Sequence, residues 1–501
     1  MTVIGYVNLP ISFNGQTKIL TTLIAPTMKR RLILGINFWR LFAIEPTIRK
    51  PSQRIIDVLE VEIAEQEERE RLTAEQREKL EEIKYKFKVF VEGKELETTP
   101  LITRTIEFAD GFKDADPVRL NPYPWSPEVQ RNVNEELDKW IKSGVVERSN
   151  SDWALLIVPV MKKSEGEDGE EQIKVRMCLD ARKLNDRTRK HAYPLPHQDR
   201  ILGRLGPAKF LSTIDLSKAF WQIPLDPASR KYTAFRVLGR GLFQFTRLPF
   251  GLVNSPATLS RLMDQVLGYG ELEPNVFVYL YDIVVASNTF EEHIQRLQEV
   301  AKRLNAANLS INVEKSKFCV AELPYLGFIL SESGVRPNPA KVEAIVNFER
   351  PSSVRSLRRF LGMVNYYRRF IEGFSAATAP LTDLLKGKPK VVQWGDEAEK
   401  AFNVLKEKLI TSPILASPNF DHPFKIQTDA SDLAIAGILT QEIAGDERII
   451  AYFSRKLTTP QRAWKAAEKE GLAALEAIER FVSWKGRLTQ QISISNPCTW
   501  G

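Results

Sequence analysis

Short strand-like runs alternate with helical patterns from about residue 153 to 330, and this alternation constrains the fold more than any other feature of the sequence. It predicts a body of the α/β or α+β class. The chain has 501 residues, and at roughly 150 residues per domain this length predicts about three domains. The longest nearly uninterrupted apolar stretch runs only from Trp153 to Met161. A membrane-spanning helix needs roughly 20 apolar residues, so no membrane partner is expected.

Cysteine and histidine usage excludes several classes of small module. The 3 cysteines lie far apart without a CxxC pair, which excludes a disulfide scaffold and a cysteine-based zinc module. The 4 histidines have no metal-ligand spacing either. The first residues lack a basic segment followed by an apolar one, so no secretory signal is expected. These observations predict a soluble, multidomain, intracellular protein.

Charge is distributed unevenly along the chain, although its formal net value is only +8. From Asp57 to Glu82 there are 11 acids and 4 bases, whereas from Arg336 to Lys390 there are 11 bases and 4 acids. The asymmetry indicates an acidic spacer and a basic surface for a polyanion; two solvated helix faces are the alternative. In the basic stretch, a helical apolar stripe leaves five arginines to meet phosphates, namely Arg355, Arg358, Arg359, Arg368 and Arg369.

Local signals place several helices and strands. The segment Thr73-Ala-Glu-Gln is a capping box that predicts the start of one helix. Ser126 followed by Pro127 predicts the start of another. Near the C-terminus, three strand-like runs precede a helix whose apolar stripe is expected to consist of Leu472, Leu475, Ile478 and Phe481.

Two segments carry candidate chemistry. In FLSTIDLSKAFWQIPL an apolar strand ends at Asp215, and a carboxylate at this position suits a hard divalent cation. The alternative is that Asp215 is a turn or cap residue. In FVYLYDIVVAS two strand runs flank Tyr281-Asp282, which predicts a tight hairpin with these two residues as its connection. An isolated hairpin of this kind would make Asp282 an ordinary turn residue.

The order of the motifs decides between these readings. VRMCLDARKLN precedes the Asp215 segment, LPFGLVNSPATLSRLMD lies between the two segments, and LSINVEKSKF, YLGFILSESGVRPNPAKVEAI and LRRFLGMVNYYRRFI follow them. From about residue 100 to 490 this succession closely resembles the reverse transcriptase of gypsy-type LTR retrotransposon Pol polyproteins. The resemblance implies an α+β or α/β multidomain chain with a right-hand polymerase followed by a truncated ribonuclease H-like fold.

The resemblance also implies domain boundaries and an N-terminal fragment. IGYVNLPISFNG and LILGINFW resemble the C-terminal half of a retropepsin-like aspartic protease, although no Asp-Thr/Ser-Gly triplet precedes them, so no protease activity is expected. The implied parts are a protease fragment (1–48), a charged linker (49–116), fingers and palm (117–335), thumb (336–385), connection (386–422) and a truncated ribonuclease H-like domain (423–501).

Individual roles are carried over position by position from the family. Asp215 matches the palm aspartate that binds both catalytic metals, and Asp282 matches the last residue of the catalytic hairpin. Phe220 matches the residue that blocks a ribose 2′-OH, Phe250 lines the nucleotide pocket, and Lys315 falls where a lysine protonates pyrophosphate. Lys163 and Arg176 match residues that grip the triphosphate, and Arg182 matches an arginine that supports the pocket. Leu326 and Gly327 match the hairpin that grips the primer. For Arg182, Phe250 and Leu326, a role in packing or turn formation is the alternative.

The catalytic hairpin departs from the family pattern Tyr-x-Asp-Asp, because it reads Tyr279-Leu280-Tyr281-Asp282. Two-metal phosphoryl transfer holds its cations about 3.5–4 Å apart, which requires several anionic ligands. A phenol that titrates near about pH 10 is neutral at physiological pH and binds Mg²⁺ poorly. Asp282, one position along the turn, is expected to point elsewhere, so the chain is predicted to polymerise very weakly or not at all.

The ribonuclease H-like part is also incomplete. Asp429 and Glu470 match its first two carboxylates, the third would fall near Ser495, and the fourth would lie beyond Gly501. We expect half of a carboxylate set not to hold two ions, and therefore no ribonuclease H activity.

The sequence thus predicts an RNA-directed DNA polymerase of a retroelement with impaired chemistry. The alternatives are a degenerate or co-opted copy that binds nucleic acid without catalysis, and a part of a longer reading frame. The resemblance implies two Mg²⁺ ions, with Mn²⁺ as a substitute. Its implied partners are RNA and DNA template–primers, dNTPs and other Pol or Gag products of the element. The implied location is a cytoplasmic virus-like particle or the nucleus.

Overall fold

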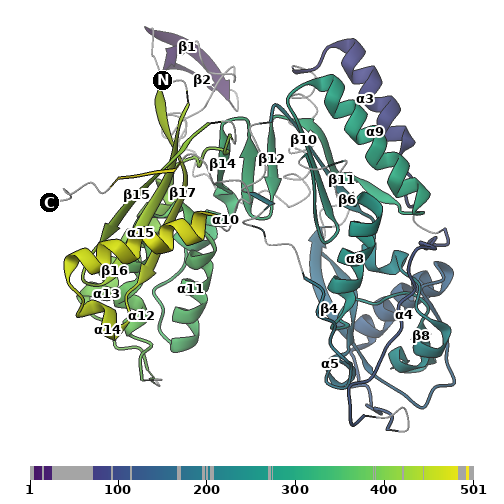
Figure 1. Ribbon diagram of the computed structural model, residues 1–501. Helices are drawn as coiled ribbons and strands as arrows, with labels where there is room; N and C mark the ends of the chain where they lie inside the picture. The colour runs from purple at the N-terminus through teal and green to yellow at the C-terminus, as the bar shows by residue number, and fades with distance from the viewer. Residues whose placement is uncertain are drawn as a thin grey trace. The chain divides into compact units, whose positions relative to one another are not determined.

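The structure is a computed structural model (Figure 1). It describes residues 5–13, 16–24, 71–91, 94–112, 116–165, 171–194, 198, 201–202, 208–268, 272, 275–387, 389, 391–419, 422–443, 445–482 and 492–495. For residues 5–13, 16–24, 162–165, 171–174, 482 and 492–495 only the backbone is described. No helix among these residues is long and apolar enough to cross a bilayer.

By its contacts the chain divides into two units, one of residues 1–62 with 164–172 and one of residues 63–163 with 173–501. In the first unit, β1 (Gly5–Phe13) and β2 (Gln16–Ile24) form an antiparallel hairpin in which Gly5 pairs with Ile24 and Phe13 with Gln16. This pairing agrees with the alternating pattern of the sequence. The assignment of residues 1–48 to a protease fragment stays a prediction, since residues 25–48 lie outside the described part.

The second unit is built around a four-stranded antiparallel sheet with the order β11-β6-β10-β9. We call it the palm sheet. One face of its central strands carries Ile214 and Ile283, which belong to the largest hydrophobic core. The other face carries Leu211 and Val284, which belong to a second core. The strands are β6 (Phe210–Leu216), β9 (Val276–Tyr279), β10 (Asp282–Ser287) and β11 (Ile311–Val320).

Three helices pack on the face of the palm sheet that carries Ile214 and Ile283. Figure 1 shows two of them, α3 and α9, side by side next to β10. The three helices are α3 (Ala74–Lys86), α8 (Ser255–Leu267) and α9 (Phe290–Ala306). The predicted capping box is confirmed. The Gln76 backbone N–H donates to the Thr73 hydroxyl, and the Thr73 backbone N–H donates to the Gln76 side-chain oxygen. Leu80, Ile83 and Phe87 are buried in the largest hydrophobic core, so this helix of the predicted linker (49–116) packs with the palm sheet.

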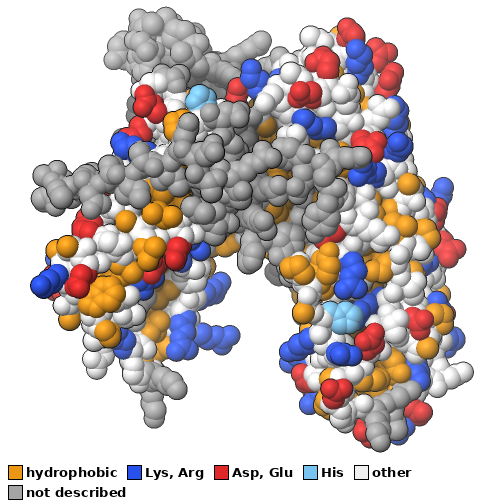
Figure 2. Space-filling model, in the orientation of Figure 1, with side chains coloured by type: hydrophobic (Ala, Val, Ile, Leu, Met, Phe, Trp, Pro, Cys, Tyr) orange, Lys and Arg blue, Asp and Glu red, His pale blue; other side chains and the backbone are white. Residues whose placement is uncertain are grey.

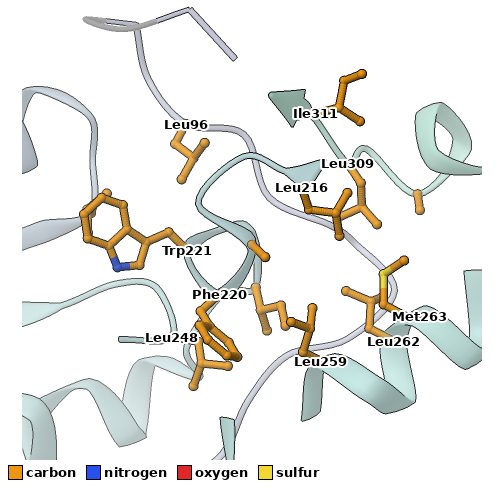
Figure 3. Close-up of a cluster of buried hydrophobic side chains, with 14 of the residues drawn as sticks. Leu96, Leu216, Phe220, Trp221, Leu248, Leu259, Leu262, Met263, Leu309 and Ile311 are labelled. Atoms are coloured by element: carbon orange, nitrogen blue, oxygen red, sulfur yellow. The ribbon is translucent and has the colours of Figure 1, made fainter. Parts of the chain in front are cut away.

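A smaller set of elements extends the main core. The Ser126 cap predicted for α4 is confirmed. Trp140 of this helix contacts Trp221, Phe235 and Phe245. Figure 3 shows part of this core, with Phe220 and Leu248 close to α8. The elements are α4 (Pro127–Lys142), β3 (Val146–Arg148), β4 (Leu156–Glu165), β5 (Glu171–Asp180), α5 (Arg182–Asn185), η1 (Ala219–Gln222), α7 (Pro227–Arg230), η2 (Lys231–Thr233), β7 (Phe235–Val237) and β8 (Gly241–Phe245).

A three-stranded antiparallel sheet and four helices follow the palm sheet in the chain. Phe360 is fully buried among them and contacts Phe402 at 4.6 Å between ring centroids. These residues share the second core with Leu211 and Val284 of the palm sheet. The elements are β12 (Glu322–Tyr325), β13 (Phe328–Ser331), β14 (Gly334–Pro337), α10 (Pro339–Val346), α11 (Val354–Tyr366), η3 (Arg368–Phe370), α12 (Phe374–Asp383) and α13 (Asp396–Ile410).

The C-terminal part is a mixed sheet with the order β17-β16-β15-β18, in which β18 runs parallel to β15. The predicted helix is present, but its stripe was partly wrong, because Leu475 is 54% exposed. Ala473 and Ala477 are buried instead. A Cβ added at Gly437 of β16 would lie only 3.1 Å from the Ala477 Cβ, so the helix and the strand approach each other closely here. The elements are β15 (Phe424–Ala430), β16 (Ala434–Ile443), β17 (Asp446–Lys456), α14 (Thr459–Arg462), α15 (Ala466–Val482) and β18 (Ile492–Ser495).

A buried polar network joins α9 to the palm sheet. His293 is fully buried, its Nε2 lies 2.6 Å from the Ser212 Oγ, and its Nδ1 lies 3.0 Å from the Ser287 Oγ. Burial, with the charges of Arg296 and Arg71, lowers the pKa of His293 to about 3. The imidazole is therefore neutral in the folded chain at every pH near neutrality.

The lowered pKa of His293 should make the stability of the folded chain depend on pH. Because its pKa is lower in the folded chain than the usual 6.5 or so, the unfolded chain binds an extra proton between about pH 6.5 and about pH 3. The free energy of unfolding should therefore fall with decreasing pH, by about 1.4 kcal/mol per pH unit from this group. Urea unfolding of the native chain and of a His293→Gln variant from pH 7 to 5 measures it. A difference between the two chains that stays constant with pH would contradict the expectation.

Candidate active site and nucleic-acid interface

The catalytic hairpin brings Asp282 opposite Asp215. In the register of β10 and β6, Asp282 pairs with Asp215, and in that of β10 and β9 it pairs with Tyr279. Directly opposed residues of antiparallel strands project from the same face. Two expectations from the sequence were therefore wrong. The connection consists of Leu280 and Tyr281 rather than Tyr281 and Asp282, and Asp282 does not point away from Asp215.

Backbone geometry explains the shift of the turn. Leu280 has a φ of 59°, a left-handed conformation that a side chain seldom adopts and that allows strand pairing to begin at once with Asp282. A pattern of apolar runs does not reveal which residue accepts such a conformation. The sequence therefore misplaced the turn by one residue.

The two carboxylates share a half-buried position without a hydrogen-bond donor among the described side chains. Burial, and then the charge of Asp215, raises the pKa of Asp282 to about 6. Burial also raises the pKa of Asp215, while the nearby Lys315 ammonium partly offsets this effect. Paired carboxylates that are disfavoured in their charged form gain most from a cation placed between them.

Tyr281 occupies the turn at the position where the family pattern has an aspartate. Its side chain is 39% exposed, and its carbonyl accepts a hydrogen bond from the Leu216 N–H at 3.3 Å. Burial and the charges of Asp282 and Asp215 raise the pKa of its phenol above the ordinary value. The phenol is therefore neutral at physiological pH and supplies no anionic ligand.

Several side chains predicted to bind the nucleotide lie around this hairpin. Phe250 contacts Phe220 edge-on at 5.0 Å between ring centroids, and the Arg176 guanidinium lies 5.3 Å from the Phe250 ring centroid. The charge of Arg176 also reaches Tyr281. Phe220 is nearly buried and Phe250 is partly exposed, so the two rings form a wall with one accessible side.

The structure does not bring the other two predicted nucleotide-binding residues, Arg182 and Lys163, into contact with this wall among the described side chains. Arg182 forms a bidentate ion pair with Asp180, with its Nε at 2.8 Å and its Nη2 at 2.6 Å from the carboxylate oxygens. The Arg182 side chain is 86% exposed, so the structure shows a local ion pair, and its role in supporting the pocket stays a prediction. Lys163 lies in β4, and its side chain is outside the described residues.

A buried glutamine, which no sequence pattern indicated, holds the end of β6 in place. The Gln222 Nε2 donates to the carbonyls of Ser217 at 2.6 Å and Ser310 at 2.9 Å, while its Oε1 accepts from the Ser310 N–H at 2.7 Å. The Asp215 N–H lies 3.1 Å from the Ser316 Oγ of β11. These contacts fix the backbone that carries Asp215.

The basic stretch forms two structures rather than one. Arg355, Arg358 and Arg359 are exposed on α11, and Figure 2 shows blue side chains gathered over this helix. Arg368 and Arg369 lie in η3 instead. Arg368 donates to the Ser454 carbonyl at 2.9 Å, and Arg369 is only 8% exposed. The expectation that all five arginines project freely was therefore wrong for these two, because the helix ends before them.

The end of α11 contacts the hairpin between β12 and β13. The Tyr366 hydroxyl donates to the Leu326 carbonyl at 2.5 Å, and the Tyr367 hydroxyl donates to the Gly327 carbonyl at 3.1 Å. Leu326 and Gly327 both have positive φ, so the predicted primer-gripping segment is a tight turn. A pocket of about 540 Å³ adjoins it, lined by Gln198, Tyr279, Phe328, Asn365, Tyr366, Arg368, Arg369, Tyr452, Phe453 and Arg480.

Asp429 and Glu470 also lie near one another. Asp429 is exposed on β15, and Glu470 is on α15. Burial, and then the charge of Asp429, raises the pKa of Glu470. Ser495 of β18 pairs with Gln427 of β15. Strand β18 is the one on which the third carboxylate was expected.

The described residues fit one divalent cation in the palm better than two. Asp215 and Asp282 supply two hard oxygen ligands on one face of the palm sheet. No group of three or more histidine, cysteine or acidic residues suited to a metal occurs among the residues that the structure describes.

The fold and the site define a class. An antiparallel palm sheet presents two opposed aspartates, with an aromatic wall and cations beside them, and an arginine-bearing helix and a ribonuclease H-like sheet follow. These features define the right-hand polymerase fold.

Comparisons with known proteins give the family. Residues 160–330 match the family "Reverse transcriptase (RNA-dependent DNA polymerase)", and residues 394–491 match "RNase H-like domain found in reverse transcriptase". The chain is 37% identical over 378 residues to the retrovirus-related Pol polyprotein from transposon opus of Drosophila melanogaster, covering 73% of this chain. It is 35% identical over 391 residues to that from transposon gypsy of the same species, covering 76% of this chain. The chain spans 37% of the length of each of these relatives.

Solved structures share the fold of this chain. A foamy viral protease–reverse transcriptase in complex with dsDNA is similar with a TM-score of 0.74 and 25% identity, covering 91% of each chain. A foamy viral protease–reverse transcriptase in complex with an RNA/DNA hybrid has a TM-score of 0.70 at 22% identity, covering 100% of this chain and 67% of that one. The chain belongs to the reverse transcriptases of gypsy-type LTR retrotransposon Pol polyproteins.

Proposed function

We propose that this chain is a reverse transcriptase core that holds a template–primer of RNA or DNA and binds dNTPs, but that extends the primer very weakly. The observation that carries the proposal is the register of the catalytic hairpin. Asp215 and Asp282 face each other, while Tyr281 stands where the family has a further aspartate. The scaffold for polymerisation is therefore present, and one anionic ligand is missing.

Asp215 and Asp282 would hold the cation, which we propose to be Mg²⁺ with Mn²⁺ as a substitute. A bound divalent cation supplies charge stabilisation for phosphoryl transfer and orients the reacting oxygens. Around it, Arg176 and Lys315 place positive charge where triphosphate and pyrophosphate oxygens would lie. The ring of Phe220 limits the space beside the sugar of an incoming nucleotide.

The proposed partners follow from the same surface. The exposed arginines of α11 suit duplex phosphates, which they would contact without reading the base sequence. Complexes of related foamy viral enzymes with dsDNA and with an RNA/DNA hybrid support a nucleic-acid duplex as the partner. Other Pol or Gag products of the same element, and a location in a cytoplasmic virus-like particle or in the nucleus, belong to the same proposal.

Binding of an RNA/DNA hybrid tests the proposed function. We expect replacement of Arg355, Arg358 and Arg359 by alanine to weaken binding at least about tenfold and to lower the salt dependence by up to about one counterion per arginine. Fluorescence anisotropy with a labelled hybrid from 50 to about 200 mM salt measures both quantities.

A matched control removes three exposed cations from another helix. The Arg131→Ala, Lys139→Ala, Lys142→Ala variant of α4 carries the same net charge as the α11 variant and should bind the hybrid like the native chain. Equal weakening in both variants would indicate attraction by net charge alone and would contradict the proposed interface.

A second candidate function is nucleic-acid binding without any catalysis. The phenol of Tyr281, which is neutral and experiences the charges of Arg176 and of the two aspartates, favours it for this chain. Primer extension separates the two candidates, because only a weak polymerase gives a product that depends on dNTPs and on Asp215.

A further inference from the structure

Tyr325 has no role in the site as described so far, yet it belongs to the core that covers one face of the palm sheet. It is the last residue of β12, pairs with Phe328 across the hairpin and is 4% exposed. Its side chain belongs to the same core as Phe277 and Val284. In the register of the palm sheet these two residues pair with each other and lie on the same face as Asp282. Tyr325 therefore shares a core with side chains that lie on the face of Asp282, and its strand β12 contacts β6, the strand that carries Asp215.

The hydroxyl of Tyr325 is buried and has no hydrogen-bond partner among the described residues. Nearly all buried polar groups in folded proteins are paired, and an unpaired one costs about 1–3 kcal/mol. Phenylalanine would fill the same volume without this cost. The unpaired hydroxyl therefore indicates a partner that arrives in another state of the protein.

Asp282 is the side chain best suited to be that partner. Asp282 lies on the palm-sheet face whose side chains share a core with Tyr325, and after burial its charge is the largest cause that raises the pKa of Tyr325. The neighbouring Tyr366 and Tyr367 already donate their hydroxyls to the carbonyls of Leu326 and Gly327. Of these three tyrosines, Tyr325 is the one whose hydroxyl has no hydrogen-bond partner among the described residues.

We infer that Tyr325 is a positioning residue whose hydroxyl donates a hydrogen bond to the Asp282 carboxylate when a cation binds in the palm. The bond would orient one carboxylate oxygen toward the cation, as second ligand shells do at other metal sites. Because Tyr325 directly precedes the Leu326–Gly327 turn, the same bond connects the primer-gripping hairpin to the metal ligand. The inference deepens the proposed function and rests on its assignment of Asp282 as a cation ligand.

A Tyr325→Phe variant tests the inference by its affinity for Mn²⁺, titrated without nucleic acid and monitored by electron paramagnetic resonance. The binding that disappears in an Asp215→Asn chain defines the palm site. We expect Tyr325→Phe to weaken this binding about tenfold or more. Its melting temperature without metal should be unchanged or higher, because the substitution removes an unpaired buried hydroxyl.

A Tyr232→Phe variant is the control for loss of a tyrosine hydroxyl elsewhere. Tyr232 packs against Phe108 and Trp153, away from the palm carboxylates, and its variant should bind Mn²⁺ like the native chain. Equal Mn²⁺ affinity of native and Tyr325→Phe chains, or no Asp215-dependent Mn²⁺ binding in the native chain, would overturn the inference. A chain that binds Mn²⁺ as expected but not the RNA/DNA hybrid would contradict the proposed function and leave the role of Tyr325 supported.

Discussion

Primer extension by a Tyr281→Asp chain is expected to exceed that of the native chain at least about 100-fold on an RNA template with Mg²⁺ and dNTPs. The substitution places a carboxylate beside Asp215 and Asp282, at the turn where the neutral phenol now lies. Charge stabilisation by a second cation is worth several kcal/mol, and each factor of ten in rate corresponds to about 1.4 kcal/mol. Extension rates of the two purified chains, measured side by side, give the ratio directly.

Two matched variants separate charge from volume. Tyr281→Asn introduces a side chain of the shape of aspartate without its charge, and Tyr281→Phe keeps the ring and removes the hydroxyl. Neither should raise the extension rate, because neither adds an anionic ligand. If the native chain extends as fast as the Tyr281→Asp chain, the hairpin obtains its ligand elsewhere and the account of the site is wrong.

The second large effect concerns Asp215. Asp215→Asn, made in the Tyr281→Asp chain, is expected to lower primer extension about 1,000-fold, since it removes the carboxylate that both cations would share. Binding of the RNA/DNA hybrid should be nearly unaffected, because Asp215 lies on the palm sheet and not among the α11 arginines. Single-turnover extension and anisotropy on the same sample measure both quantities.

Asp152→Asn in the same Tyr281→Asp chain is the control. Asp152 is an exposed carboxylate that pairs with Arg119 and belongs to no part of the site, so extension should be unchanged. Extension that survives Asp215→Asn would show that catalysis does not use this carboxylate.

Much of the fold was predictable where a single chain segment carries the whole signal. The Thr73 and Ser126 caps depend on residues three positions apart, and β15, β16 and β17 on short local runs of strand-like residues; the structure confirms them. The stripe of α15 failed at Leu475 because small side chains sit at the close approach to β16. A hydrophobicity pattern ranks leucine above alanine and so misses such a contact.

The candidate site was predictable in its residues but not in its geometry. Motif order identified Asp215 and Asp282, whereas their opposition depends on the left-handed Leu280 and on the register between strands 67 residues apart in the chain. Gln222 and Tyr325 gave no signal at all, because their roles depend on Ser310 and Asp282, which are remote in sequence. Long-range register decides which side chains meet, and single-sequence patterns carry little information about it.

The number of divalent cations held by the palm tests the central claim most directly. Mn²⁺ would be titrated into the native chain and into the Tyr281→Asp chain, each with template–primer and an incoming nucleotide, and the binding lost on Asp215→Asn would be counted. We expect one Asp215-dependent ion in the native chain and two in the Tyr281→Asp chain. Two such ions in the native chain would contradict the claim that Tyr281 leaves the palm one ligand short.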